Sequence, residues 1–262
     1  ECVMNQYLIT PAMGKRLMAK GLLAHPAIQK ALKAATVVIV SGTTNGYVAE
    51  EILKHLGQSA GFSRDGFYRG RTLPPKRPAT VAEPKAIKAP ATDVVIANGT
   101  WQKGKTIFDV VDSLKEGDVI LKGANALDVE HRRAAVYIGD PKAGTIGAAL
   151  QAVVGRRVRL ILPVGLEKRV TCDLDTLAAK VNVPGAKGPR LLPVSGEVFT
   201  EVDALRVLAG VSAVIVAAGG VLGAEGGVWL GMDGEPAQVD AAMEVLRSIS
   251  GEPLFADGLS AG

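Results

Sequence analysis

Short runs of apolar, mostly β-branched residues alternate along the chain with stretches in which apolar residues recur at helical spacing. Thr36–Val40 (TVVIV) is an unbroken run, which is typical of a strand covered on both faces of a parallel sheet. A polar, glycine-containing turn follows at Ser41–Gly46, and Val48, Ile52 and Leu56 then mark one face of a helix. This segment predicts a strand, a turn and a helix.

The same alternation continues through the first 190 residues. Repeated strand–helix units predict an α/β fold, with a Rossmann-like, doubly wound and mainly parallel sheet and right-handed crossovers. Ligands bind such sheets outside the carboxyl ends of the strands. Other strands are predicted at residues 2–9, 93–97, 118–121, 134–138 and 158–162, and other helices at 11–25, 27–34, 104–115, 145–154 and near 173–181.

The pattern changes after residue 190. Strands are predicted at 191–199, 211–217 and 227–232, and helices at 201–209 and 236–249. A short final strand near 253–256 would complete a ferredoxin-like α+β sandwich. We therefore predict two domains: a Rossmann-like ligand-binding domain at 1–190 and a smaller ferredoxin-like domain at 191–262.

The turn at Ser41–Gly46 is the strongest local sign of a binding site. Hydroxyls and free backbone N–H groups at the start of a helix favour an anion such as phosphate or carboxylate. The alternative is a plain helix start, because Ser, Thr and Asn are also good N-caps. At an exposed helix end the dipole contributes only about 0.3–1 kcal/mol, so an anion would need further partners.

Lys122 is a candidate for such a partner, because it follows a predicted central strand and precedes Gly123. Burying a lysine without a partner destabilises a protein by roughly several kcal/mol. If Lys122 is buried, we therefore expect a bound anion or an acidic side chain beside it. Asp128 and Asp140 are the candidate acids for this pairing. The alternative is that Lys122 extends to solvent.

Other strand ends have the same small, polar character. Asp140 is the acid that we would test first for catalysis, although it could simply orient the loop before the next helix. The glycine-rich run 217–227 is followed by a predicted strand rather than a helix, so it indicates a hairpin or β-bulge and not a dinucleotide fingerprint. The candidate catalytic residues are Asp140, Lys122 and Glu225, and the candidate ligand-binding residues are Ser41, Gly42, Thr43, Thr44, Asn45, Gly46, Asn98, Gly99, Lys122, Gly123, Asn125, Gly144 and Thr145.

The stretches Thr36–Leu56 and Asp118–Pro163 resemble the superfamily of sugar-phosphate isomerases, acyl-CoA transferases and related sensor domains. The resemblance implies a Rossmann-like sheet, a phosphate-binding turn matched by Gly42–Thr44, and a small lid domain. Ribose-5-phosphate isomerases have an acidic D-G-A-D motif where this chain has Lys122–Asn125 (KGAN), so the carboxylate base of that reaction has no counterpart here. A CoA transferase would need a glutamate nucleophile, for which Glu225 is the candidate.

Composition narrows the class of protein. The 262 residues are 48% hydrophobic and 21% charged, which excludes a disordered chain, and no apolar run is long enough for a membrane span. Cys2 and Cys172 lie far apart and the three histidines are scattered, so we predict no metal site, no cofactor and a cytoplasmic location.

The net charge of +4 is concentrated in one segment. Residues 61–90 contain seven Lys and Arg, two acidic residues and five prolines, which predicts an arm or lid more than a nucleic-acid-binding surface. We therefore expect a homo-oligomer that binds an anionic small molecule, of the sugar-phosphate, nucleotide or acyl-CoA class, and acts on it as an isomerase or transferase. The alternative is a catalytically inactive ligand-sensing or interaction module of the same fold.

Overall fold

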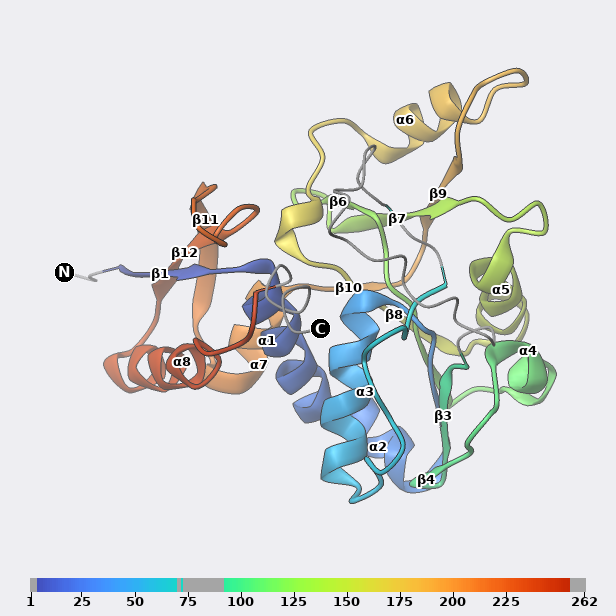
Figure 1. Cartoon of the computed structure of the whole chain (residues 1–262), viewed down its shortest axis with the longest axis horizontal. Helices are drawn as coiled ribbons and strands as arrows, with labels where there is room; N and C mark the ends of the chain where they lie inside the picture. Colours follow the sequence, from blue (N-terminus) through green and yellow to red (C-terminus); the bar gives the residue numbers. More distant parts are fainter. Residues whose placement is uncertain (1–3, 70–71, 73–91, 255–262) are drawn as a thin grey trace, which may run out of the picture.

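The computed structural model describes residues 4–69, 72 and 92–254. These residues form a mixed α/β structure with one six-stranded sheet and two three-stranded sheets (Figure 1). The predicted α/β class is confirmed. Most of segment 61–90, and residues 255–256 of the predicted final strand, lie outside the described residues.

The six-stranded sheet is mixed, with three parallel and two antiparallel strand pairings. Its first four strands are parallel, whereas β3 and β4 are antiparallel additions at one edge. The prediction of a parallel neighbour at 93–97 is therefore wrong in direction, because an apolar run specifies a buried strand but not the orientation of its partner. The order is β10 (Glu197–Phe199), β8 (Arg159–Pro163), β5 (Val119–Leu121), β2 (Thr36–Ile39), β3 (Val94–Ala97) and β4 (Thr100–Trp101).

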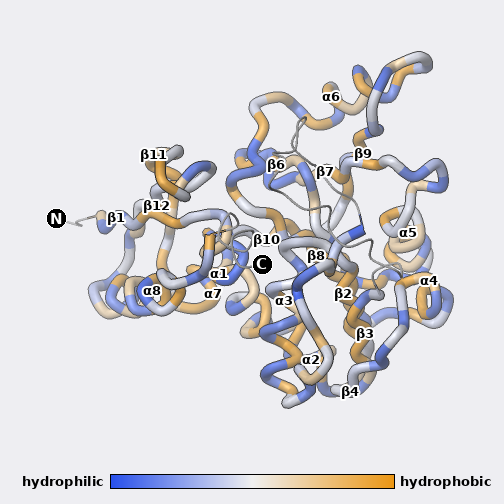
Figure 2. The backbone as a smooth tube through the Cα atoms, in the orientation of Figure 1, coloured by the Kyte–Doolittle hydropathy of each residue, from blue (hydrophilic) through white to orange (hydrophobic). Residues whose placement is uncertain are grey.

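Helices cover both faces of this sheet. Helices α2 (Pro26–Ala34) and α3 (Thr43–His55) lie on one side, and α4 (Ile107–Val110) and α5 (Gly144–Arg156) on the other (Figure 1). Hydrophobic residues are concentrated along β2 and β3, between these helices (Figure 2). The predicted helix at 104–115 is shorter than expected: one α-turn capped by Thr106 continues into a 3₁₀ turn at Val111–Ser113.

After β5, the chain enters a second, three-stranded sheet. Strand β7 was predicted to join the main sheet but instead pairs antiparallel with β6 and β9. Four residues separate β5 from β6, and β6 forms a hairpin with β7. Because β7 pairs within this hairpin, it is not a strand of the main sheet. The elements of this layer are β6 (Ala126–Asp128), β7 (Arg133–Ile138), β9 (Arg190–Val194), the 3₁₀ turn η2 (Leu166–Lys168) and α6 (Leu174–Val181).

The third sheet joins the two ends of the described chain. Its central strand β12 pairs with the N-terminal β1 and with β11, and the hairpin predicted at the glycine-rich run connects β11 to β12. Strand pairing crosses the predicted domain boundary at residue 190, since β9 and β10 pair with β7 and β8, and β1 pairs with β12. The elements are β1 (Asn5–Ile9), β11 (Ser212–Ala218), β12 (Val228–Asp233), α7 (Glu201–Ala209) and α8 (Pro236–Ser248).

Helix α1 (Pro11–Ala24) packs against both α3 and α7. A Cβ atom at Gly21 would lie 2.7 Å from the Cα of Ala204, so the absence of a side chain allows α1 and α7 to approach closely. Arg16 on the same helix binds three carboxylates, those of Glu50 and Glu51 on α3 and of Glu252 after α8. Helix α1 therefore connects the main sheet layer to the third sheet.

Candidate functional site

The carboxyl ends of the four parallel strands form one continuous edge. Backbone hydrogen bonds extend beyond the strands, from Val40 N to Leu121 O at 3.0 Å, from Lys122 N to Ile161 O at 3.1 Å and from Val164 N to Phe199 O at 3.0 Å. The chain segments that leave β2, β5, β8 and β10 are therefore held side by side. They bring the start of α3, Lys122, the 3₁₀ turn η2 and the start of α7 to the same edge.

Helix α3 begins at this edge without a capping side chain. Its N-cap is Gly42, and no side chain accepts a hydrogen bond from the first turn. The side chains of Ser41–Gly46 therefore do not cap α3, although Gly42 is itself a common N-cap residue. The side-chain oxygens of Ser41, Thr44 and Asn45 are buried and have no hydrogen-bond partner among the described residues.

Asn45 and Gly46 also have structural roles. The amide nitrogen of Asn45 donates to Val40 O at 2.8 Å and to Leu121 O at 3.0 Å, which joins the ends of β2 and β5. A Cβ atom at Gly46 would lie 3.4 Å from the Cγ of Arg64. Of the predicted turn, Ser41–Thr44 and the side-chain oxygen of Asn45 remain available to a ligand.

Asp93, immediately before β3, forms a hydrogen bond with the turn that begins at Ser41. This buried carboxylate accepts hydrogen bonds from Ser41 N at 2.8 Å and from Ile107 N at 2.7 Å, and it forms an ion pair with Arg69 at 3.0 Å. The antiparallel direction of β3 places Asp93 here, because the start of β3 lies beside the end of β2. Asp93 thus fixes the position of Ser41.

Lys122 follows β5 and is partly buried. Its Nζ donates to Gly123 O at 3.2 Å, and no carboxylate of the described residues lies within 4.0 Å of it. Burial and the positive charge of Lys168 lower the pKa of Lys122 to about 8, and Asp93 only partly opposes this shift. The two acids predicted to pair with it are elsewhere: Asp128 binds His131, and Asp140 accepts from Lys142 N.

Two more lysines lie along the edge. Lys15, from α1, forms an ion pair with Glu167 at 2.9 Å, and both side chains are largely buried. Lys168 donates to Ala124 O at 2.9 Å. Burial and the charge of Lys15 lower the pKa of Lys168. We refer to Lys15, Lys122 and Lys168 as the lysine cluster.

Glu201 is the acid at the far end of this edge, at the start of α7. It is 2% exposed and its carboxylate accepts from Leu166 N at 3.0 Å. Burial and the nearby charge of Glu167 raise its pKa to about 8. A Cβ at Gly14 would lie 2.5 Å from Glu201 Oε1, so the glycine makes room for the carboxyl group against α1.

This raised pKa predicts how stability changes with pH. The folded protein retains the Glu201 proton up to about pH 8, whereas the unfolded chain loses it near 4.5, so this group's contribution to stability falls as pH rises through that window. Glu201→Gln removes the titration, so the wild-type Tm should fall by several degrees relative to the variant between pH 5 and 9. Thermal unfolding across this range measures the difference. Glu244→Gln, on the exposed side of α8, is the control, and parallel Tm profiles of wild type and Glu201→Gln would contradict the prediction.

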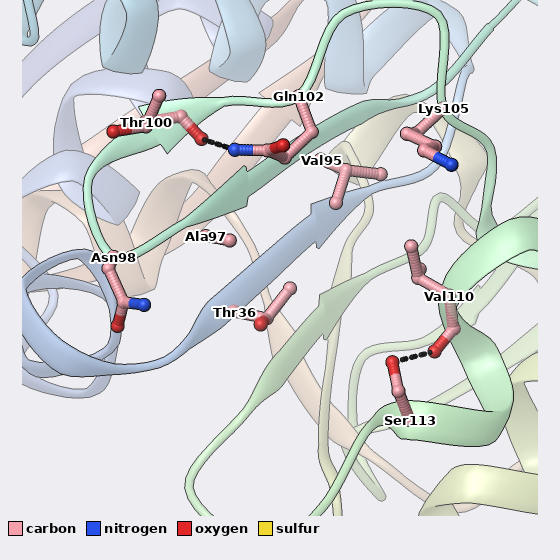
Figure 3. A pocket seen from close by; sticks show the side chains of 9 residues that line it. All are labelled: Thr36, Val95, Ala97, Asn98, Thr100, Gln102, Lys105, Val110 and Ser113. Carbon is pink, nitrogen blue, oxygen red and sulfur yellow. Dashed lines mark hydrogen bonds between the residues drawn. The ribbon is translucent and has the colours of Figure 1, made fainter.

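Asn98 and Gly99 lie at the opposite edge of the sheet. Thr36, the first residue of β2, pairs with Ala97, so the β3–β4 turn is at the amino ends of the parallel strands. A surface pocket lies there and includes Asn98 (Figure 3). Its other lining residues come from β2, β3, β4 and the loop after it, α4, and the 3₁₀ turn that follows α4. This pocket is separate from the lysine cluster.

The other predicted residues are dispersed. Asn125 accepts from Tyr137 N at 3.0 Å within the second sheet. Asp140 is exposed in the loop before α5, which begins with Gly144 and Thr145. Glu225 is exposed at the β11–β12 hairpin and accepts from Gly223 N at 2.8 Å. The structure brings Gly123 and Lys122 to the turn at Ser41–Thr44, but not Asp140 or Glu225.

Five charged residues of the edge were not predicted: Lys15, Asp93, Glu167, Lys168 and Glu201. Two of them could have been found, since Glu167 and Lys168 follow the strand predicted at 158–162 by a few residues. Lys15 and Glu201 depend on the packing of α1 and on the pairing of β10 with β8, which the local pattern does not specify.

Comparison of the chain with protein-family models, with characterised proteins and with solved structures finds no match. In the described part of the chain, no group of three or more His, Cys, Asp or Glu side chains is arranged to hold a metal ion. Among the helices of the same residues, none has both the length and the apolar character to cross a membrane. The site is therefore interpreted from its own geometry.

Proposed function

We propose that this protein binds a phosphorylated or otherwise anionic small molecule at the carboxyl ends of β2, β5, β8 and β10. The main support is the start of α3, which has no side-chain cap and where the hydroxyls of Ser41 and Thr44 are buried without partners in the described part of the chain. Buried polar groups in folded proteins are almost always hydrogen-bonded, so unpaired hydroxyls beside free helix N–H groups favour an anionic ligand.

The charges of the edge support the same proposal. With Glu201 protonated below about pH 8, Glu167 is the one carboxylate of the described residues that balances the lysine cluster, because Asp93 is paired with Arg69. A dianion such as a phosphate monoester would compensate the remaining positive charge. Sugar phosphates, nucleotides and acyl-CoA esters all have such groups.

Phosphate binding by thermal shift and calorimetry tests this proposal. Inorganic phosphate at a hundred times its Kd should stabilise the protein by about 2.7 kcal/mol. The double variant Ser41→Ala/Thr44→Val should weaken phosphate binding by at least tenfold, since two hydrogen bonds to a charged group are removed. Thr176→Val, on an exposed helix turn of α6, is the control. No stabilisation by phosphate, sulfate or any phosphate ester would refute the proposal.

The edge also has groups suited to acid–base chemistry. The pKa values of Glu201 and Lys122 are each displaced to about 8, and displaced pKa values are frequent at active sites. This favours an isomerase or transferase. The burial of Glu201, which is only 2% exposed and hydrogen-bonded to backbone, favours the second candidate, a ligand-sensing module without turnover. Turnover assays with sugar phosphates and acyl-CoA esters separate the two.

A further inference from the structure

We infer that Lys122 is a nucleophile for a carbonyl group, and that the ligand class is aldehydes or ketones that carry a phosphate or carboxylate. This inference rests on the proposed anion site at Ser41–Thr44 and adds a covalent step to it. The anionic group would lie at the start of α3 and the carbonyl carbon at the amino group of Lys122.

The position of Lys122 beside the start of α3 is the first argument. Ile39 pairs with Leu121 in the parallel ladder, so Lys122 comes opposite Val40, one residue before Ser41. Leu121 O accepts hydrogen bonds from Val40 N and from the side chain of Asn45, both at 3.0 Å. Since neighbouring strands lie about 4.8 Å apart, the lysine leaves the backbone one strand spacing from the anion-binding turn.

The surroundings of the amino group are the second argument. A carboxylate partner keeps a lysine in its ammonium form, which has no lone pair for attack. Among the described residues, Lys122 Nζ donates to the carbonyl of Gly123, at 3.2 Å, and forms no ion pair. The charges of Lys168 and Arg69 act on it, and burial disfavours its charged form. A desolvated lysine beside other cations is the usual setting of an amine that attacks carbonyl groups.

The other two lysines of the cluster are held differently. Lys15 is paired with Glu167 at 2.9 Å, and its side chain is 6% exposed. Lys168 donates to Ala124 O at 2.9 Å, and the negative charge of Glu167 opposes the lowering of its pKa by burial and by Lys15. These contacts suit the two residues to charge compensation and leave Lys122 as the reactive amine.

The step balances without an oxidant or a reductant. The neutral amine of Lys122 attacks the carbonyl carbon, a carbon–nitrogen bond forms, and the electron pair of the carbonyl π bond moves to oxygen. The oxygen then leaves as water with the two amine protons, which gives an imine. The reaction is reversible, and hydrolysis returns the free lysine and the carbonyl compound.

Reductive trapping tests the inference, with pyridoxal 5′-phosphate as a phosphorylated aldehyde probe and pyridoxal as the matched probe without phosphate. The full chain is incubated with a low concentration of each probe and cyanoborohydride, and the modified peptides are identified by mass spectrometry. We expect the adduct predominantly on Lys122, at least tenfold more with the phosphorylated probe, and suppressed by inorganic phosphate. Lys122→Arg should abolish this adduct, while Lys54→Arg, at the exposed end of α3, should retain it.

The outcomes separate the covalent step from anion binding. If phosphate stabilises the protein but the adduct is spread over exposed lysines, or persists in Lys122→Arg, the inference about Lys122 is wrong and the proposed anion site stands. If phosphate neither stabilises the protein nor competes with trapping, the anion site itself is wrong. An adduct on Lys122 that forms equally with both probes also contradicts the inference, because the phosphate would then have no role.

Discussion

Replacing Lys122 with methionine is expected to weaken phosphate binding by about 10–100-fold, since a hydrogen bond to a charged group contributes about 1.5–3 kcal/mol. The same change should raise the Tm of the ligand-free protein. Methionine keeps the apolar stem of the side chain and removes a desolvated charge that lies near Lys168. Calorimetry with inorganic phosphate and thermal unfolding without it measure the two effects.

Opposite signs for stability and affinity are what distinguish a ligand-binding lysine from a structural one. A lysine that held the fold together would lose stability when replaced, and its effect on phosphate would be secondary. Lys54→Met, on the exposed end of α3, removes one positive charge from the same helix and should leave both quantities nearly unchanged. A less stable Lys122→Met protein with normal phosphate affinity would remove Lys122 from the site.

Gly21→Ala is expected to destabilise the protein by about 3 kcal/mol, the upper part of the usual range for overpacking. The added Cβ would lie 2.7 Å from both Cα and Cβ of Ala204 and 3.1 Å from the ring of Phe199, so α1 and α7 would have to separate. Backbone cannot move aside as the end of a flexible side chain can. Urea denaturation measures the loss.

A glycine on another helix provides the matched control. Gly155 lies in α5, and a Cβ there would meet no atom within 4 Å. Gly155→Ala should therefore stabilise the protein by about 0.5–1 kcal/mol, through the higher helix propensity of alanine. Equal effects of the two substitutions would show that helix propensity, and not the contact between α1 and α7, determines the outcome at Gly21.

The local pattern was sufficient where a segment's structure depends on its own residues. The β-branched run at 36–40 and the glycine turn after it gave β2 and the start of α3, because burial on both faces requires such a run and the turn ends it. The partner of each strand was harder to predict. Residues 134–138 form a strand as predicted, but this strand pairs with β6 and β9 and not with the main sheet. No property of a short apolar run specifies which distant strand lies beside it.

The candidate site was predicted only in part, because its residues come together through strand pairings that the local pattern does not specify. Ser41–Thr44 and Lys122 follow strands that were recognised, and their neighbourhood follows from parallel pairing of β2 with β5. Glu201 was assigned to a separate domain because β10 is only three residues long and its pairing with β8 is not visible in the sequence. Asp140 was placed at the edge on the assumption that β7 belonged to the main sheet.

The pairing of β1 with β12 also bears on how the chain folds as it is synthesised. Tyr7 pairs with Leu230, about 220 positions later in the sequence. At a synthesis rate of about 5–20 residues per second, β1 leaves the ribosome on the order of 10–45 s before its partner strand. The main sheet can assemble in that interval, whereas the third sheet cannot close until β12 is complete. Until then β1 has no partner from this sheet, so closure of the third sheet comes late in the synthesis of this part of the chain.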